Sequence, residues 1–229
     1  MVFDKYTREA KLYPAIATLL PFLLLCSFAF EDYLSGFVNT VLSLVIGGAS
    51  VAIALIFVLM EANRFISKMM LEKRYFDSEL MMPTTNLLLF KDSTYSDDHK
   101  ERIRKKIYAD FGKQLLSKRE EADNETLARQ LIAEAVSMIR AKMKGGRLIL
   151  QHNTQYGAAR NLIGGSYIAL GVSIVAMATF LWVAPNPIAV VLSLVLCVIY
   201  ATLIISGKYI MTNLGTYYAR VLFQEYIGS

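Results

Sequence analysis

Four acidic residues occur as adjacent pairs, Asp97-Asp98 and Glu120-Glu121, and carboxylates are the side chains that acid–base catalysis often uses. The first pair directly follows Ser96, a residue type that favours the N-cap of a helix. Carboxylates in the first turn of a helix stabilise it by opposing the helix dipole. We therefore expect Asp97 and Asp98 to support a helix start, and the pairs do not by themselves predict an enzyme.

The side chains that bind metals are few and scattered. His99 and His152 each stand alone, without a second histidine or cysteine at ligand spacing. Cys26 and Cys197 both lie within apolar segments, where cysteine usually acts as a small hydrophobic side chain. No Walker-type loop, dinucleotide-binding glycine motif or nucleophile elbow is present. The sequence therefore predicts no metal, no cofactor, no disulfide and no enzymatic activity.

Charge is strongly segregated along the chain. Nineteen uncharged residues run from Leu12 to Phe30, twenty-eight from Tyr33 to Met60 and forty-seven from Asn161 to Gly207. The hundred residues from Glu61 to Arg160 carry nineteen of the 24 Lys and Arg and fourteen of the 19 Asp and Glu. A helix needs about 20 apolar residues to cross the hydrocarbon of a bilayer. The pattern predicts a membrane sector that carries a charged domain outside the bilayer.

We expect four transmembrane helices. The first run supplies one, kinked at Pro21, and the second supplies Phe37–Met60. The third run is long enough for a hairpin of Leu162–Ala184 and Ile188–Gly207. The predicted fold is an all-α integral membrane protein with a mainly helical cytosolic domain inserted between the second and third transmembrane helices. Its parts are residues 1–60 with the first two transmembrane helices, the cytosolic domain at 61–160, the transmembrane hairpin at 161–207 and a C-terminal cytosolic helix at 208–229.

Lys and Arg at the ends of the apolar runs indicate the orientation. These residues are Lys5, Arg8, Lys11, Arg64, Lys68, Lys73, Arg74, Arg160 and Lys208. All of them lie on the side of the central domain, and the short connections on the other side carry none. Both termini and the central domain are therefore predicted to face the cytoplasm, and the lipid bilayer is the first expected partner.

The predicted spans contain no Asp, Glu, Lys, Arg or His. Many ion-coupled transporters keep such residues at membrane depth, so the spans suit either a passive anchor or a pore with an apolar constriction. Small residues recur at three- and four-residue spacing and allow helices to approach closely. They are Thr40, Ser43, Gly47, Ser50 and Ala54 on the second span and Gly165, Ala169 and Ser173 on the third. Such faces pack helices within one chain or, in a homo-oligomer, between copies around a pore.

Within the central domain, Ser96 is expected to begin a helix with the apolar stripe Ile103, Ile107, Phe111 and Leu115. A polar connector, Ser117–Asn124, leads to a second helix, Glu125–Met143. The residues that this helix is expected to bury are Leu127, Leu131, Ile132, Ala135, Met138 and Ile139. The apolar run Asn86–Phe90 indicates a strand or a buried turn, and Arg147–Gln151 is its expected partner as a strand.

Basic residues of the domain form two clusters. They are Lys100, Arg102, Arg104, Lys105 and Lys106 in the first, and Arg140, Lys142, Lys144 and Arg147 in the second. If the two helices are antiparallel, both clusters line one trough that binds a polyanion: nucleic acid, a nucleotide or anionic lipid. The alternative is a set of solvated faces attracted to the anionic inner leaflet.

A polar segment leads from the domain into the third span. Its members are Gln151, His152, Asn153, Tyr156, Arg160 and Asn161. Such a joint transmits a movement of the domain to the membrane helices, or it is a hydrogen-bonded segment at the membrane interface.

Two stretches resemble small four-helix membrane effectors of bacterial anti-phage defence. They are Met82-Pro-Thr-Thr-Asn-Leu-Leu-Leu, and Leu150-Gln-His-Asn with the later Tyr156-Gly and Arg160-Asn-Leu-Ile-Gly-Gly165. The family that the chain resembles most is the channel-forming partner of the nucleotidyltransferase in Hailong-type systems. The resemblance implies a homo-oligomer, by analogy a tetramer, in the bacterial inner membrane. It also implies an ion channel that a short DNA oligomer holds shut and that depolarises the membrane during abortive infection.

The sequence therefore favours a defence effector that is an oligomeric ion channel gated through its cytosolic domain, with a nucleotidyltransferase as a further partner. Two alternatives stay open. One is a membrane-anchored sensor or scaffold that binds a phage or defence protein. The other is a membrane-bound enzyme that processes lipid or nucleotide.

Overall fold

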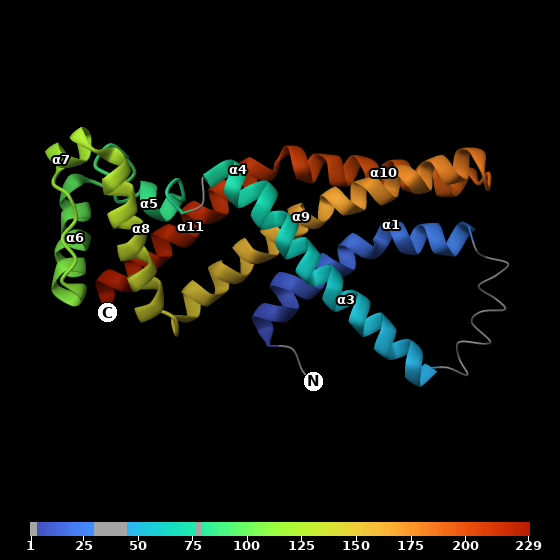
Figure 1. Cartoon of the computed structure of the whole chain (residues 1–229), viewed down its shortest axis with the longest axis horizontal. Helices are drawn as coiled ribbons and strands as arrows, with labels where there is room; N and C mark the ends of the chain where they lie inside the picture. The colour runs from blue at the N-terminus through green and yellow to red at the C-terminus, as the bar shows by residue number, and fades with distance from the viewer. Residues whose placement is uncertain (1–3, 30–44, 77–78) are drawn as a thin grey trace. The chain divides into compact units, whose positions relative to one another are not determined.

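Figure 1 shows the computed structural model of the chain, which describes residues 4–29, 45–76 and 79–229. Regular structure in these residues is helical, and no strand occurs among them. The helices are η1 Thr7–Leu12, α1 Tyr13–Ala29, α3 Val45–Ser67, η2 Lys68–Glu72, α4 Lys73–Phe76, α5 Pro83–Asn86, α6 Asp97–Phe111, α7 Lys118–Asp123, α8 Glu125–Lys142, α9 Arg147–Trp182, α10 Pro187–Ile205 and α11 Gly207–Gly228. The predicted all-α class is therefore confirmed for the described part of the chain.

The chain divides into two compact units. Unit 1 consists of Met1–Leu71 and Gly157–Lys208, and unit 2 consists of Glu72–Tyr156 and Tyr209–Ser229. Helices α9 and α11 therefore contribute residues to both units.

Unit 1 contains the apolar helices. Three helical segments of the described chain are long and apolar enough to cross a membrane, namely Thr7–Ala29, Arg147–Trp182 and Pro187–Ile205. They match the first predicted span and the two helices of the predicted hairpin, and they indicate membrane association. The second predicted span, Phe37–Met60, lies partly outside the described residues, and its remainder is helical from Val45 onward.

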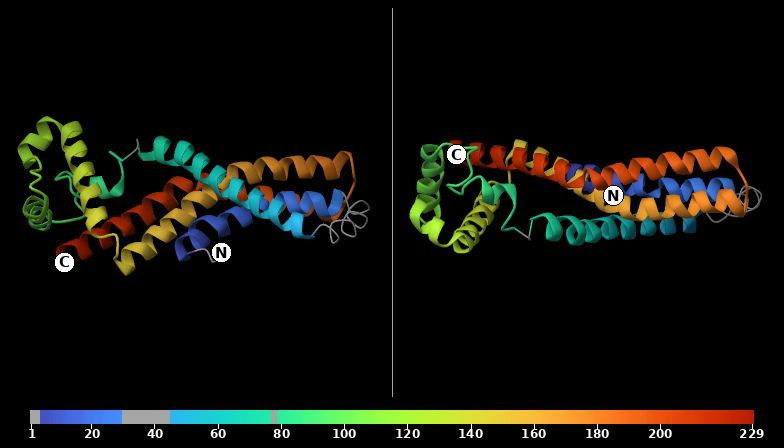
Figure 2. Two further views of the ribbon diagram at one scale, coloured as in Figure 1. Left: turned by 60° about the horizontal axis from the view of Figure 1, so that its bottom comes forward. Right: turned by 90° about the horizontal axis from the view of Figure 1, so that it is seen from above.

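Helices α9 and α10 form the predicted helical hairpin, and a short turn connects them. The Asn186 side chain accepts a hydrogen bond from the backbone N–H of Ala189 at 3.1 Å and caps α10, and Pro187 occupies the first turn. Proline suits this position because the first turn of a helix leaves its N–H groups unpaired. Figures 1 and 2 show α9 and α10 side by side. In the same region, Phe28 of α1 packs edge-on against Phe180 of α9, with ring centroids 6.1 Å apart.

Neither Asn86–Phe90 nor Arg147–Gln151 forms a strand. Pro83–Asn86 forms the single helical turn α5, and Leu87, Leu88 and Leu89 follow it as buried turns. The alternative of a buried turn is therefore confirmed. The expected partner strand, Arg147–Gln151, is instead the start of α9, which begins well before the predicted span.

Helix α6 of unit 2 begins where the sequence predicts it. The Ser96 hydroxyl accepts a hydrogen bond from the backbone N–H of His99 and caps α6. Gly112 ends α6 with φ of 64°, a left-handed conformation that glycine adopts without steric cost. The predicted connector at Ser117–Asn124 is wrong in one respect, because Ser117 and Glu120 form a capping box that begins the short helix α7.

Helices α6 and α8 run in the same direction, so the expected antiparallel arrangement is wrong. Residues 112–117 return along α6, and Lys118 pairs with Asp97 at the start of α6 at 2.7 Å. Helix α8 then runs back, and Lys142 at its end pairs with Asp110 at the end of α6 at 2.8 Å. Six extended residues cover about 20 Å, close to the length of about 22 Å that the fifteen residues of α6 span.

The core of unit 2 forms between the buried turn, α6, α8, the first turn of α9 and α11. Its buried residues are Leu87, Leu88, Leu89, Ile103, Ile107, Ala128, Ile132, Ala135, Val136, Ile139, Ile149, Ala219, Leu222, Phe223 and Tyr226. The C-terminal helix thus completes the small core that the sequence assigned to the central domain. Ring stacking of Phe111 on Tyr226, with centroids 6.2 Å apart, joins α6 to α11.

Helix α8 buries only part of the predicted set. Ile132, Ala135 and Ile139 are buried as expected, but Leu127 and Met138 are 40% and 38% exposed. The core contacts α8 on the side of Ala128, Ile132, Val136 and Ile139, which turns the predicted stripe by about one residue. Leu127 and Met138 are therefore left on the surface of the described chain.

Candidate functional site

Four basic side chains of unit 2 hold one loop, Glu79–Asp92, which we call the clamped loop. This loop follows α4, contains α5 and carries the buried Leu87, Leu88 and Leu89. Its carbonyl groups need hydrogen-bond donors because its backbone makes no extended helix. The donors come from α6 and α8, and three of the four belong to the predicted polyanion clusters.

Lys100 is fully buried, and its ammonium group donates to the carbonyls of Phe90 and Asp92. Burial lowers the pKa of the Lys100 ammonium group, because a charge is less stable out of water. The side chain ends inside the domain rather than on its surface. Lys100 is therefore a structural donor to the clamped loop.

Arg104 lies one helical turn after Lys100 and joins the clamped loop to α7 and to the segment before it. Its guanidinium donates to the carbonyl of Leu88 at 2.7 Å, to the carbonyl of Leu116 at 2.6 Å and to Glu121 Oε2 at 2.8 Å. It also stacks over the Phe90 ring at 4.1 Å from the centroid. Burial lowers the pKa of Arg104, opposed by the charge of Glu121.

Glu121 completes this centre with both of its carboxylate oxygens. Oε2 accepts from Arg104, and Oε1 accepts from the backbone N–H of Phe90 at 2.5 Å. The side chains of Arg104 and Glu121 are only 10% and 5% exposed. The second predicted carboxylate pair thus divides into two structural roles, with Glu120 in the capping box of α7 and Glu121 in a buried ion pair.

Helix α8 supplies the other two donors. Arg129 donates to the carbonyl of Leu80 and to Asn86 Oδ1, both at 2.7 Å. Arg140 donates to Thr84 Oγ1 at 3.1 Å and pairs with Glu79 at 3.4 Å. The clamped loop is therefore held from both helices.

The remaining basic residues of the two predicted clusters have different surroundings. Lys106 donates to the backbone carbonyl of Ser229 at 3.0 Å, and Lys142 pairs with Asp110. The exposed members are Arg102, Lys105, Lys142, Lys144 and Arg147. Because α6 and α8 are parallel, the first cluster begins near the start of α6, while the second lies in the last turn of α8 and just after it. The structure does not bring the nine residues together in one trough.

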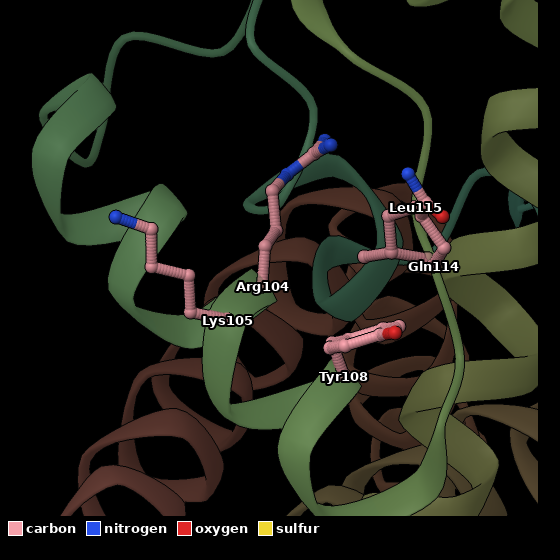
Figure 3. A pocket seen from close by; sticks show the side chains of 5 residues that line it. All are labelled: Arg104, Lys105, Tyr108, Gln114 and Leu115. Carbon is pink, nitrogen blue, oxygen red and sulfur yellow. The ribbon is translucent and has the colours of Figure 1, made fainter.

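An open groove of ≈ 430 Å³ lies between α6 and residues 112–117. Its lining residues are Arg104, Lys105, Tyr108, Gln114 and Leu115. Figure 3 shows the Lys105 side chain pointing away from Gln114 and Leu115. The guanidinium of Arg104 is already bound by Glu121 and two carbonyls, and the exposed Lys105 is the other cation among the lining residues.

The predicted joint is part of one continuous helix. All six of its residues, Gln151, His152, Asn153, Tyr156, Arg160 and Asn161, lie within α9. Gln151 and Asn153 are exposed, whereas Asn161 is buried. Its side-chain amide donates to the carbonyl of Ala10 at 2.6 Å and accepts from the Ser67 hydroxyl at 3.3 Å.

Asn161 belongs to a buried group of uncharged polar side chains in unit 1, which we call the polar cluster. Its other members are Thr18 of α1 and Asn63 and Ser67 of α3. Asn63 Nδ2 donates to Thr18 Oγ1 at 2.9 Å, and its Oδ1 has no hydrogen-bond partner among the described residues. The cluster links three helices of unit 1 by hydrogen bonds.

Two glycines of α9 allow its backbone to pass close to α3 and to Thr18 of α1. An added Cβ at Gly165 would clash with Thr18 Oγ1 and lie 2.6 Å from Asn63 Nδ2. At Gly164 it would lie 2.7 Å from the backbone oxygen of Asn63 and 2.8 Å from the backbone nitrogen of Ser67. The backbones of α3 and α9 therefore approach closely here.

The other predicted small residues are placed as follows. Gly165, Ala169 and Ser173 are buried, and the Ser173 hydroxyl donates to Ala169 of its own helix. Ala54 is exposed. Thr40 and Ser43 lie outside the described residues, and Gly47 and Ser50 lie within α3.

The part of the chain that the structure describes holds no group of three or more His, Cys, Asp or Glu positioned for a metal ion. Comparison with protein-family models, with curated proteins and with solved structures finds no match.

Proposed function

We propose that the chain is a four-span membrane protein whose copies assemble into an ion channel, with unit 2 in the cytoplasm controlling its opening. The spans are α1, α3 with the apolar run before it, α9 and α10. At about 1.5 Å per residue, the 36 residues of α9 extend about 54 Å, well beyond the roughly 30 Å of hydrocarbon. Its N-terminal part, Arg147–Asn161, therefore continues outside the bilayer.

The polar cluster is the observation that carries this proposal. Apolar helices that part in water must expose hydrocarbon, whereas hydroxyl and amide groups can exchange their hydrogen bonds for bonds to water. Thr18, Asn63, Ser67 and Asn161 provide such groups where α1, α3 and α9 meet. In the proposed topology they lie at the cytoplasmic ends of the spans, beside Lys11 and Glu61, which pair at 3.3 Å.

Control by unit 2 is supported by the continuity of α9. The same helix contributes Arg147–Tyr156 to unit 2 and carries Asn161 of the polar cluster. A ligand that tilts or rotates the first turns of α9 therefore acts on the hydrogen bonds of Asn161. The setting of the proposal comes from the resemblance to Hailong-type effectors: the bacterial inner membrane, depolarisation in abortive infection and a nucleotidyltransferase partner.

The channel is tested by ion flux through liposomes that contain the purified full chain. The Thr18→Val variant removes the acceptor of Asn63 Nδ2 with little change in volume. An unsatisfied buried amide costs about 1–3 kcal/mol, so the closed state is weakened and basal flux is expected to rise severalfold.

Thr202→Val is the matched control, because the Thr202 hydroxyl is exposed and donates to Val198 of its own helix. Its flux is expected to equal that of the parent chain. Absence of flux from every variant would reject the channel and leave the sensor or scaffold. Equal flux from Thr18→Val and the parent would reject the role of the polar cluster.

A polyanionic ligand of unit 2, if it is a short single-stranded DNA, is expected to contact the exposed Lys105. Lys105→Glu should weaken binding and reduce the salt dependence of the binding constant by about 0.7 per lost phosphate contact. The measurement is a titration of fluorescent oligonucleotide at several salt concentrations. Lys118→Glu is the control, because Lys118 is exposed and lies outside both clusters. Equal affinities for the two variants would place the ligand elsewhere.

A further inference from the structure

Two prolines of the first apolar helix each remove one backbone hydrogen bond. A proline has no N–H group, so the carbonyl four residues before it loses its ordinary helical donor. Pro21 lies inside α1, and the carbonyl that loses its donor there belongs to Ala17. Pro14 lies in the first turn of α1, and the residue four positions before it is Ala10 of η1. Neither carbonyl can therefore form the i→i−4 hydrogen bond of an α-helix.

Side chains of two other helices donate to these two carbonyls. The Tyr200 hydroxyl of α10 donates to the carbonyl of Ala17 at 2.6 Å, and the Asn161 amide of α9 donates to the carbonyl of Ala10 at 2.6 Å. Both donor side chains are buried, as are both prolines. A backbone carbonyl in the hydrocarbon of a membrane needs a donor within the protein. Tyr200 and Asn161 therefore take the place of the two missing N–H groups.

An interior proline sets α1 apart from the other apolar helices. The remaining prolines of the chain are Pro83, Pro185 and Pro187, of which Pro187 lies in the first turn of α10. Helices α3 and α9 contain no proline. Sharp bends of helices occur at proline, where one backbone hydrogen bond is absent. A bend is therefore easier in α1 than in its neighbours.

We propose that α1 is the helix that moves when the channel opens, bending at Pro21, and that the hydrogen bond from Tyr200 holds it in the closed state. Before this bend, Thr18 of α1 belongs to the polar cluster, and after it, Phe28 packs against Phe180 of α9. A bend at Pro21 therefore moves α1 away from the polar cluster while its far end stays packed. The role of α1 rests on the proposed ion channel and names the helix that opens it.

The hydrogen bond from Asn161 connects this movement to unit 2. Asn161 lies on α9, whose residues up to Tyr156 belong to unit 2. Its bond to Ala10 holds the start of the apolar segment, about 10 Å along the helix from Ala17. A shift of α9 releases Ala10, and Tyr200 on α10 then remains as the hold on α1. Removing the Tyr200 bond is therefore expected to favour the open channel without a ligand on unit 2.

A double-mutant cycle tests whether Tyr200 replaces the N–H that Pro21 lacks. Tyr200→Phe removes the donor to Ala17, and Pro21→Ala returns a backbone N–H to residue 21, which can then bond the same carbonyl. Thermal unfolding is measured on the full chain in detergent. Tyr200→Phe is expected to lower the unfolding temperature by about 2–4 °C, the shift that one hydrogen bond gives in a chain of this size. In the Pro21→Ala background the same substitution is expected to have little effect, because the carbonyl keeps a donor.

Tyr209→Phe is the matched control, because the Tyr209 side chain is exposed and makes no hydrogen bond within the described chain. Its unfolding temperature is expected to equal that of the parent chain. Equal shifts from Tyr200→Phe in the two backgrounds, or no shift in either, would overturn the proposal. The hydroxyl would then not replace the N–H of residue 21.

Ion flux through liposomes tests the movement of α1 in the same variants. Tyr200→Phe is expected to raise basal flux about two- to tenfold in the parent chain, the change in an equilibrium that one hydrogen bond gives, and to leave it unchanged in the Pro21→Ala chain. Equal flux from Tyr200→Phe and a conducting parent would overturn the role of α1 in opening.

The hydrogen-bond pairing and the channel fail independently in these measurements. Coupling of Tyr200→Phe with Pro21→Ala in the unfolding temperature, without flux from any variant, keeps the pairing and rejects both the channel and the movement of α1. Flux without this coupling keeps the channel and rejects Pro21 as its hinge.

Discussion

Replacing Glu121 by glutamine is expected to destabilise unit 2 by about 3–5 kcal/mol, the usual cost of removing one partner of a buried ion pair. Both oxygens of Glu121 accept hydrogen bonds, one from Arg104 and one from the N–H of Phe90. A glutamine has a single side-chain oxygen and must turn its NH₂ group toward one of these donors. The charge of Arg104 is then left without its partner inside the domain.

The effect is measured on the full chain in detergent micelles. Urea unfolding followed by circular dichroism should show an earlier transition for the variant, and trypsin should cleave faster after Lys91 in the clamped loop. Faster cleavage is expected because the loop loses one of its fixed contacts at Phe90.

Glu120→Gln is the matched control on the neighbouring residue. Only Oε2 of Glu120 takes part in the described hydrogen bonds, accepting from the backbone N–H and the hydroxyl of Ser117. A glutamine can keep these bonds with its oxygen and turn its NH₂ group to solvent. The control is expected to lose less than about 0.5 kcal/mol, the range of surface substitutions. Equal losses in the two variants would contradict the role given to Glu121.

The clamp around the loop was partly visible in the sequence. Lys100 and Arg104 are four residues apart and share a helical face with the buried Ile103 and Ile107. This helical period predicts that both basic side chains point into the domain. Taken as one contiguous basic run, they suggested a surface for a polyanion instead. Their acceptors are carbonyls of the clamped loop, and no residue pattern identifies those because every residue carries a carbonyl.

The start of α6 was predicted from a local signal, the N-cap residue Ser96, and the structure confirms it. Ser96 and Gly112 bound α6 because a hydroxyl N-cap and a left-handed glycine act within a single turn. The predicted direction of α8 relative to α6 was wrong. It depends on the extended course of residues 112–117, and no local sequence signal indicates that this segment is extended. The small-residue pattern found Gly165 but missed Asn63, since Asn63 lies beyond the apolar run that ends at Met60.

Adding a methyl group at Gly164 is expected to push α3 away from α9 and to destabilise unit 1 by about 1–3 kcal/mol, the usual cost of overpacking. The new Cβ would lie 2.6 Å from Ser67 Cβ, 2.7 Å from the Asn63 carbonyl oxygen and 2.8 Å from the Ser67 nitrogen. Two of these are backbone atoms, so no rotation of a side chain can relieve the contact. Thermal unfolding of the detergent-solubilised Gly164→Ala chain should occur at a lower temperature than that of the parent.

Gly171→Ala on the same helix separates crowding from helix propensity. An added Cβ at Gly171 meets no described atom within 4 Å, and alanine in a helix interior is favoured over glycine by about 0.5–1 kcal/mol. The control is therefore expected to raise the unfolding temperature while Gly164→Ala lowers it. Opposite signs from the same substitution would place the close crossing of α3 and α9 at Gly164. Two shifts of the same sign would mean that α3 does not approach α9 there, and the hydrogen bonds of the polar cluster would lose their structural basis.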